Sequence, residues 1–247
     1  IEELKEKAIE KNLIKEEYGD LFACEIMGMI STRPDEFIRK FDSIKENSGV
    51  EEALSYFYNY QIKNNYIQKT AIDKNLLWVD NSRENRIEIS INLSKPEKKN
   101  SDIAKMLVTK STSYPKCLLC KENIGFSGNL SKAPRQNIRF IPLKLSGNEW
   151  FMQYSPYGYY SEHAIVINEK HVPMTIHKNT FQNILDFVSI FPSYFVGSNA
   201  DLPIVGGSIL AHEHFQGGNY EFPMAKASIE KEITFEGFED VKAGIVN

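Results

Sequence analysis

A short stretch late in the chain, residues 212–216 with the sequence His-Glu-His-Phe-Gln, constrains the fold more than any other segment. It follows the apolar run 207–211, whose length, branched residues and glycine boundary are typical of a buried strand. Side chains two apart on a strand share a face. A strand that continues through this stretch therefore predicts a sheet with His212, His214 and Gln216 on one wall.

Composition limits what such a sheet can belong to. At 247 residues with 42% hydrophobic content, the chain is long enough for one large or two modest domains. A net charge of −4 argues against a nucleic-acid partner held by a broad basic field. The apolar stretches fall short of the ~18–20 residues of a membrane span, and the first residues are charged rather than signal-like. Three cysteines, two of them closely spaced, indicate a reducing compartment, and we expect a cytoplasmic protein without a membrane partner.

The pattern along the chain predicts an α+β fold. Residues 1–110 form a helical N-terminal section with a strand pair, and residues 111–247 form the core that contains every histidine. A helix capped by Asn179 or Thr180 should flank the sheet. The chain begins without a methionine and stops just after a strand-like segment, so we expect it to be a piece of a longer protein.

The pair Cys117 and Cys120 has the spacing at which two thiolates can bind one metal ion. Because a zinc site normally has four ligands and Cys24 stands alone in the helical region, histidines must complete it. The candidates are His163, in a strand-like segment, and His212. A redox dithiol and a structural cysteine pair without chemistry remain alternatives.

Two further segments are candidates for binding a phosphate. Gly206, Gly207 and Ser208 precede the histidine stretch, and glycine N–H groups there could hold phosphate oxygens. Arg135 and Asn137 lie in a basic segment that is either a pocket edge facing a phosphate or a base, or a solvated hairpin loop.

The chemistry of His-x-His-x-Gln has two interpretations. Two histidines at this spacing are often a metal pair, but the cupin pattern that begins in the same way requires a Glu where this chain has Gly218 and Asn219. The other interpretation is nucleophilic attack on phosphorus by His214, with the Gln216 amide donating to a phosphate oxygen. A histidine nucleophile needs its second nitrogen held, often by a main-chain carbonyl. Glutamine cannot shuttle protons, which favours a good leaving group such as a sugar phosphate.

Several separated motifs together carry a family resemblance. Residues 198–208, residues 212–218, the Cys117–Cys120 pair and the segment from Tyr154 to His163 resemble the galactose-1-phosphate uridylyltransferases of the histidine-triad superfamily, specifically their second, bacterial sequence class. The resemblance implies a histidine-triad-like antiparallel sheet. It also implies a nucleotidyltransferase of galactose metabolism that exchanges a uridylyl group between UDP-glucose and galactose 1-phosphate through a covalent uridylyl-histidine.

The resemblance also implies roles for individual residues and a homodimer. His214 matches the nucleophile and Gln216 the residue that holds the transferred phosphate. The set that matches the structural zinc ligands is Cys117, Cys120, His163 and His212. The set that matches contacts to the uridine diphosphate is Asn199, Gly207 and Ser208.

The chain departs from the family's better-studied class in two ways. Glu213 and Phe215 replace a proline and a glycine, and both should face away from the chemistry. Members of the second class are considerably longer than this chain. Two alternatives stay open: a related dinucleotide phosphorylase that shares His-x-His-x-Gln, and a zinc-stabilised binding domain that has no need of His214.

Overall fold

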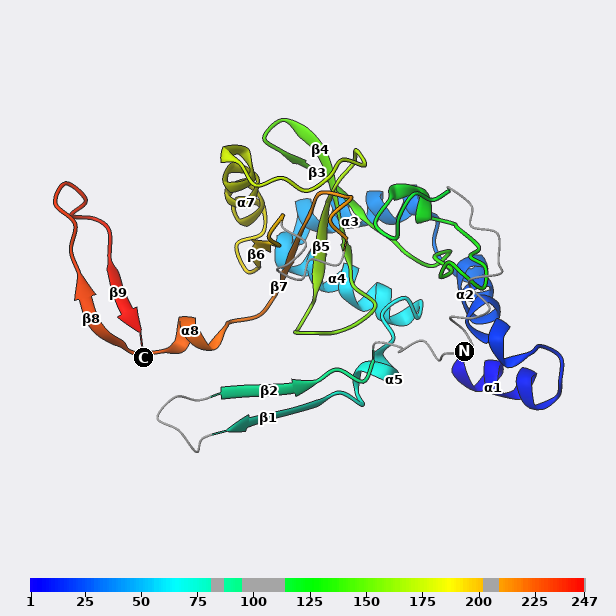
Figure 1. The fold of residues 1–247 in the computed structure, drawn as a ribbon. Helices are drawn as coiled ribbons and strands as arrows, with labels where there is room; N and C mark the ends of the chain where they lie inside the picture. Colours follow the sequence, from blue (N-terminus) through cyan, green and yellow to red (C-terminus); the bar gives the residue numbers. More distant parts are fainter. Residues whose placement is uncertain (81–86, 95–113, 202–208, 247) are drawn as a thin grey trace.

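The computed structural model describes residues 1–80, 87–94, 114–201 and 209–246. It confirms the predicted α+β class, with a helical N-terminal section followed by an antiparallel sheet (Figure 1). The helices are α1 (Glu2–Glu10), η1 (Glu16–Tyr18), α2 (Gly19–Ile30), α3 (Pro34–Ser48), α4 (Val50–Lys63), α5 (Lys69–Ile72), η2 (Lys121–Asn123), α7 (Lys178–Ile190) and α8 (Pro223–Lys226). The strands are β1 (Leu76–Asp80), β2 (Ile87–Ile91), β3 (Ile141–Leu145), β4 (Asn148–Tyr154), β5 (Ala164–Asn168), β6 (Phe195–Ser198), β7 (His214–Gly218), β8 (Ile229–Ile233) and β9 (Ala243–Val246).

The main sheet has the order β3-β4-β5-β7-β6, and each neighbouring pair is antiparallel. β7 therefore lies between β5 and β6, although a long stretch of chain separates it from each. Two further hairpins, β1–β2 and β8–β9, project from the body of the molecule in Figure 1. Because β7 lies inside the sheet, its main chain is paired with a strand on each side. This pairing determines which face of the sheet each of its side chains occupies.

Helices α3 and α4 pack on the sheet as an antiparallel pair. Pro34 begins α3 with two acidic residues in the first turn, which suits the positive end of the helix dipole. Phe37 and Phe41, four residues apart, are buried on one face of α3 and contact Phe57 of α4. Gly49 joins the two helices with φ of 95°, a backbone conformation that favours glycine.

The two faces of the sheet have different partners. Phe215 points into the larger core, where its ring stacks on Trp150 with centroids 5.0 Å apart and is fully buried. His214 and Gln216 alternate with Phe215 and therefore occupy the other face. That face packs a smaller cluster, which includes Ile167 and Leu119.

The structure corrects the strand predicted at residues 207–211. Residues 207 and 208 lie outside the described residues, and 209–213 are not strand, because β7 begins only at His214. The main chain of 209–213 bonds instead to the segment that follows β5, through Met174 N to Leu210 O at 2.9 Å and Glu213 N to Val172 O at 2.7 Å. His212 therefore precedes the strand, and the shared face predicted for His212 and His214 from strand alternation stays a prediction.

The strand pair, the flanking helix and the boundary between the two sections were also predicted from the sequence. The strand pair of the N-terminal section is present as β1–β2, and the flanking helix is α7, which begins at Lys178 rather than at the predicted Asn179 or Thr180 cap. The predicted boundary at residue 110 lies outside the described residues and stays a prediction. Within the described part of the chain, no helix is both long and apolar enough to cross a bilayer.

Candidate functional site

His214 is held by both of its ring nitrogens at the start of β7. Its Nδ1 lies 2.7 Å from the main-chain oxygen of His212. A carbonyl oxygen can only accept, so Nδ1 carries the hydrogen, and in the neutral ring Nε2 keeps its lone pair. Nε2 lies 3.2 Å from the Asn199 side-chain amide nitrogen. The imidazole therefore presents the nitrogen that keeps its lone pair toward the loop that follows β6.

Electrostatics favour the neutral form of this ring. Burial lowers the pKa of His214, while its bond to the His212 carbonyl opposes the shift. The side chain is buried in the protein, with 4% of the residue exposed. A neutral imidazole with one fixed N–H and a lone pair on the other nitrogen is the state required of a histidine nucleophile.

A chain of polar contacts continues from His214 across the sheet. Gln216 Nε2 donates to Asn199 Oδ1 at 3.0 Å, so both residues lie beside His214. Gln216 Oε1 lies 3.1 Å from Nε2 of His163, and Nδ1 of His163 lies 3.2 Å from the carbonyl of Tyr157. Asn199 and Gln216, both predicted from the sequence as site residues, are thus brought together with His214. Their amides offer N–H donors where an anionic oxygen beside Nε2 would sit.

A second cluster includes His212, two residues before His214. Cys117, Cys120, His171 and His212 place one ligand atom each within 4.8 Å of one another, and this group could hold a metal ion. Nδ1 of His212 lies 3.3 Å from the Cys117 sulfur, and Nδ1 of His171 lies 3.0 Å from the Cys120 sulfur. Asn123 fixes the cysteine turn, since its side chain donates to the carbonyls of Cys117 and Cys120.

The donor set fits a metal better than it fits free thiols. Nε2 of His212 lies 2.8 Å from the Asn168 carbonyl, which must accept, so Nδ1 directs its lone pair at the cysteines. Burial raises the pKa of the Cys120 thiol to about 11. Thiolates form at this position only with a compensating positive charge, which a bound cation supplies.

The fourth member of the cluster differs from the sequence prediction. His163 was expected as a ligand, but its ring contacts Gln216 and the Tyr157 carbonyl instead, so the assignment is corrected to His171. His163 precedes β5 and His171 follows it. His171 could have been identified from its position just after β5, the strand that pairs with β7. In an antiparallel pair the end of one strand lies beside the beginning of the other, so His171 comes close to His212.

The other predicted substrate contacts have different outcomes. Gly206, Gly207 and Ser208 lie outside the described residues. The expectation for Asn137 is corrected, because its buried amide bridges the N-terminal helices through Cys24 and the Asn64 carbonyl.

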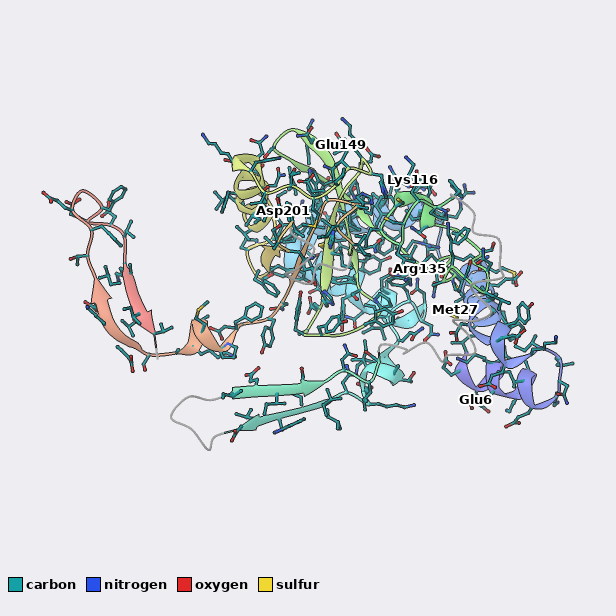
Figure 2. All side chains as sticks on the ribbon, in the orientation of Figure 1. Glu6, Met27, Lys116, Arg135, Glu149 and Asp201 are labelled. Carbon is teal, nitrogen blue, oxygen red and sulfur yellow. The ribbon has the colours of Figure 1, made fainter. Side chains whose placement is uncertain are left out.

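Arg135 has its guanidinium 5.5 Å from the Tyr66 ring centre. In Figure 2 it lies toward α2, well apart from Asp201 in the loop after β6. Its role in binding stays a prediction.

Comparisons with known proteins agree with one another. Residues 3–173 match the family model described as galactose-1-phosphate uridyl transferase, N-terminal domain. A galactose-1-phosphate uridylyltransferase of Clostridium acetobutylicum is 53% identical over 241 residues, covering 97% of this chain and 48% of the relative. Proteins with the same name from Butyrivibrio fibrisolvens and Bacillus subtilis are 46% and 47% identical, covering 100% and 93% of this chain and 64% and 45% of the relatives.

The chain spans about half the length of most of these curated relatives. The matches at near-complete coverage of this chain extend past the family model and include the His214 region. No solved structure matches the chain.

Proposed function

Because this chain belongs to the galactose-1-phosphate uridyl transferase family, we propose that it carries the nucleophile half of a uridylyl exchange between UDP-glucose and galactose 1-phosphate. The observation that supports this most directly is the contact between Nδ1 of His214 and the His212 carbonyl, 2.7 Å long. It leaves the lone pair of a buried, neutral ring on Nε2, the atom that faces the Asn199 amide and would attack phosphorus.

In the proposed first step, Nε2 of His214 attacks the α-phosphorus of UDP-glucose. A nitrogen–phosphorus bond forms, the bond from that phosphorus to the bridging oxygen breaks, and glucose 1-phosphate leaves with the electron pair. In the second step an oxygen of galactose 1-phosphate attacks the same phosphorus, which releases His214 and gives UDP-galactose. The leaving group in each direction is a sugar phosphate with a second pKa of ~6, so it departs without a proton donor.

Gln216 and Asn199 serve the transferred phosphate. The Gln216 amide donates to Asn199 with one hydrogen, which leaves its second N–H for a phosphate oxygen. Amide donors stabilise the charge that builds up on the phosphoryl oxygens without taking part in proton transfer. A donor that does not transfer protons is consistent with glutamine at this position, where a third histidine would act as an acid.

We further propose that the metal of the Cys/His cluster is zinc, held by Cys117, Cys120, His171 and His212. Two thiolates and two imidazoles are a donor set typical of structural zinc. The ion would supply a structural cross-link and positive charge for the buried thiolates. His212 connects the two sites, because its ring faces the cysteines and its carbonyl orients His214.

We also propose a cytoplasmic location and a homodimeric assembly. All three cysteines are free in the structure, which suits a reducing cytoplasm and a thiolate metal site. The resemblance also implies a homodimer that acts on small molecules. Recovery of the protein outside the cytoplasmic fraction would contradict the location. A monomer mass by light scattering of the full-length protein would contradict the homodimer.

Intact-mass spectrometry after brief incubation with UDP-glucose tests the proposed chemistry. We expect a uridylyl-sized mass gain that is labile in acid and stable in base, and that is absent from His214→Asn. His177→Asn is the matched control, since His177 is exposed at the start of α7. The test is run on this chain and on a chain of the relatives' length. Absence of the adduct from both would reject the uridylyltransferase assignment and favour a zinc-stabilised binding domain.

A further inference from the structure

His163 is a buried histidine that neither the metal cluster nor the proposed phosphorus chemistry uses directly. Only 5% of the residue is exposed. It lies at the end of the loop before β5, next to the strand that carries the nucleophile. A buried imidazole beside a reacting centre needs a physical reason for its position.

Both ring nitrogens of His163 have defined partners. Nδ1 lies 3.2 Å from the Tyr157 carbonyl, and Nε2 lies 3.1 Å from Oε1 of Gln216. The carbonyl can only accept, so Nδ1 carries a hydrogen in either charge state. The remaining variable is the hydrogen on Nε2, which is the atom that faces the Gln216 amide.

The ring is fixed in place by packing rather than by charge. Tyr160 and Tyr159 contact it, with ring centroids 4.6 Å and 5.4 Å away. The end of β7 closes tightly on the same loop, because a Cβ on Gly218 would lie 2.9 Å from the carbonyl oxygens of Ser161 and Glu162. His163 therefore cannot move away from Gln216 without opening this contact.

The charge that can vary at this position is that of His163 itself. Burial lowers the pKa of His163, and the bonds to Tyr157 and Gln216 oppose that shift. Burial raises the pKa of Tyr160, so its phenol stays neutral. The neighbouring carboxylate of Glu162 accepts a hydrogen bond from the Tyr194 hydroxyl. Gln216, from β7, is uncharged.

The hydrogen on Nε2 determines which end of the Gln216 amide can face His163. A protonated ring donates to Oε1, which leaves the amide nitrogen toward Asn199, the arrangement seen here. A neutral ring offers a lone pair at Nε2, and the amide must turn over to meet it with N–H. Turning the amide would also place the Gln216 oxygen, in place of its nitrogen, toward Asn199. Asn199 in turn contacts Nε2 of His214, so the change would reach that atom.

We propose that His163 is a positioning residue for the uridylyl transfer, and that it acts on the reaction by setting the orientation of the Gln216 amide beside the nucleophile. This inference rests on the proposed function. His163 reaches the phosphate only through Gln216, so its effect should appear in the rate of transfer and should depend on the Gln216 side chain.

A double-mutant cycle on the full-length protein tests that dependence. His163→Phe keeps a ring against Tyr160 but removes both nitrogens, and Gln216→Met keeps length and volume but removes the amide. With UDP-glucose as the probe, we expect His163→Phe to slow adduct formation by on the order of ten- to a hundredfold, with a smaller change in KM. In the Gln216→Met background the same change should have little further effect. Full additivity of the two losses would overturn the proposal.

A matched pair of amide replacements separates this role from simple packing. His163→Gln carries its amide near the position of Nε2 and can still contact Gln216, whereas His163→Asn carries it near Nδ1 and can contact only the Tyr157 carbonyl. We expect His163→Gln to retain the greater rate of adduct formation. Equal rates, or a faster His163→Asn, would mean that His163 only anchors the loop, and would refute the proposal.

The pH profile supplies a readout that packing does not move. The ratio of the wild-type adduct rate to the His163→Phe rate removes the titration of His214, which both proteins share, and this ratio should change across the range below pH ~6.5 where His163 titrates. A ratio that stays constant over that range would refute the inference. A wild-type protein that forms no adduct rejects the proposed function itself, whereas an active wild type with an additive cycle rejects the role of His163 alone.

Discussion

The two ends of β5 carry the same residue type in different chemical settings. His171, after the strand, turns its Nδ1 to the Cys120 sulfur at 3.0 Å. His163, before the strand, turns its Nε2 to the Gln216 amide at 3.1 Å. Because β7 runs antiparallel to β5, the beginning of β7 lies beside the end of β5 and the later part of β7 beside its beginning. One strand pair thus separates the candidate metal cluster, after the end of β5, from the contact between His163 and Gln216, at its beginning.

The largest difference between the two ends should appear when each histidine is replaced by asparagine. We expect His171→Asn to lose zinc and to lower the free energy of unfolding by several kcal/mol, because an incomplete site leaves the buried Cys120 and the half-buried Cys117 without their cation. The melting temperature should fall by on the order of 10 °C. Metal analysis and thermal unfolding measure both effects.

His163→Asn is the control at the other end and should keep its zinc. If instead His163→Asn loses the metal and His171→Asn retains it, the assignment of ligands made from the structure is reversed and the original sequence prediction is restored.

An intermediate effect is expected at Asn168, the last residue of β5. Its side-chain amide donates to the Glu213 carboxylate at 2.7 Å, while its main-chain carbonyl lies 2.8 Å from His212 Nε2. Asn168→Ala removes the first contact and keeps the second. We expect a loss of about 1–3 kcal/mol in the free energy of unfolding, since the buried carboxylate loses its donor. Zinc content should stay unchanged.

Asn148→Ala, in the exposed start of β4, is the matched control for this measurement. A chemical denaturation curve that is the same for Asn168→Ala and Asn148→Ala would show that the Glu213 contact contributes nothing to stability.

The smallest effect concerns the pH dependence of stability at the His163 end. Burial lowers the pKa of His163 in the folded protein below the ~6.5 of the unfolded chain. Below pH ~6.5 the unfolded chain therefore binds this proton more readily, and the free energy of unfolding falls as the pH drops toward the folded pKa. His163→Phe lacks this contribution.

The stability of the wild-type protein relative to His163→Phe should therefore decrease between pH 7 and pH 5. Urea unfolding at the two pH values measures this difference. A relative stability that rises toward pH 5 would mean that the folded ring holds its proton more tightly than the unfolded chain does.

Much of the site was predictable because it depends on residue type and close spacing. The cysteine pair, His214 and Gln216 were identified from short motifs, and Phe215 was placed on the opposite face by strand alternation alone. The helix at Pro34 was marked by its own capping and acidic residues. These features depend on residues that are close together in the chain, so the sequence pattern is enough to predict them.

The sequence by itself determined which chemical groups are available: two closely spaced thiols, two histidines two residues apart and an amide two residues further on. The tertiary structure alone decided which histidine joins which group. His163 and His171 both flank a strand-like segment, and no local pattern distinguishes a metal ligand from a neighbour of Gln216. That choice depends on the antiparallel register of β5 and β7 and on where 209–213 leave the sheet. Both depend on contacts between segments far apart in the chain, which periodicity does not encode.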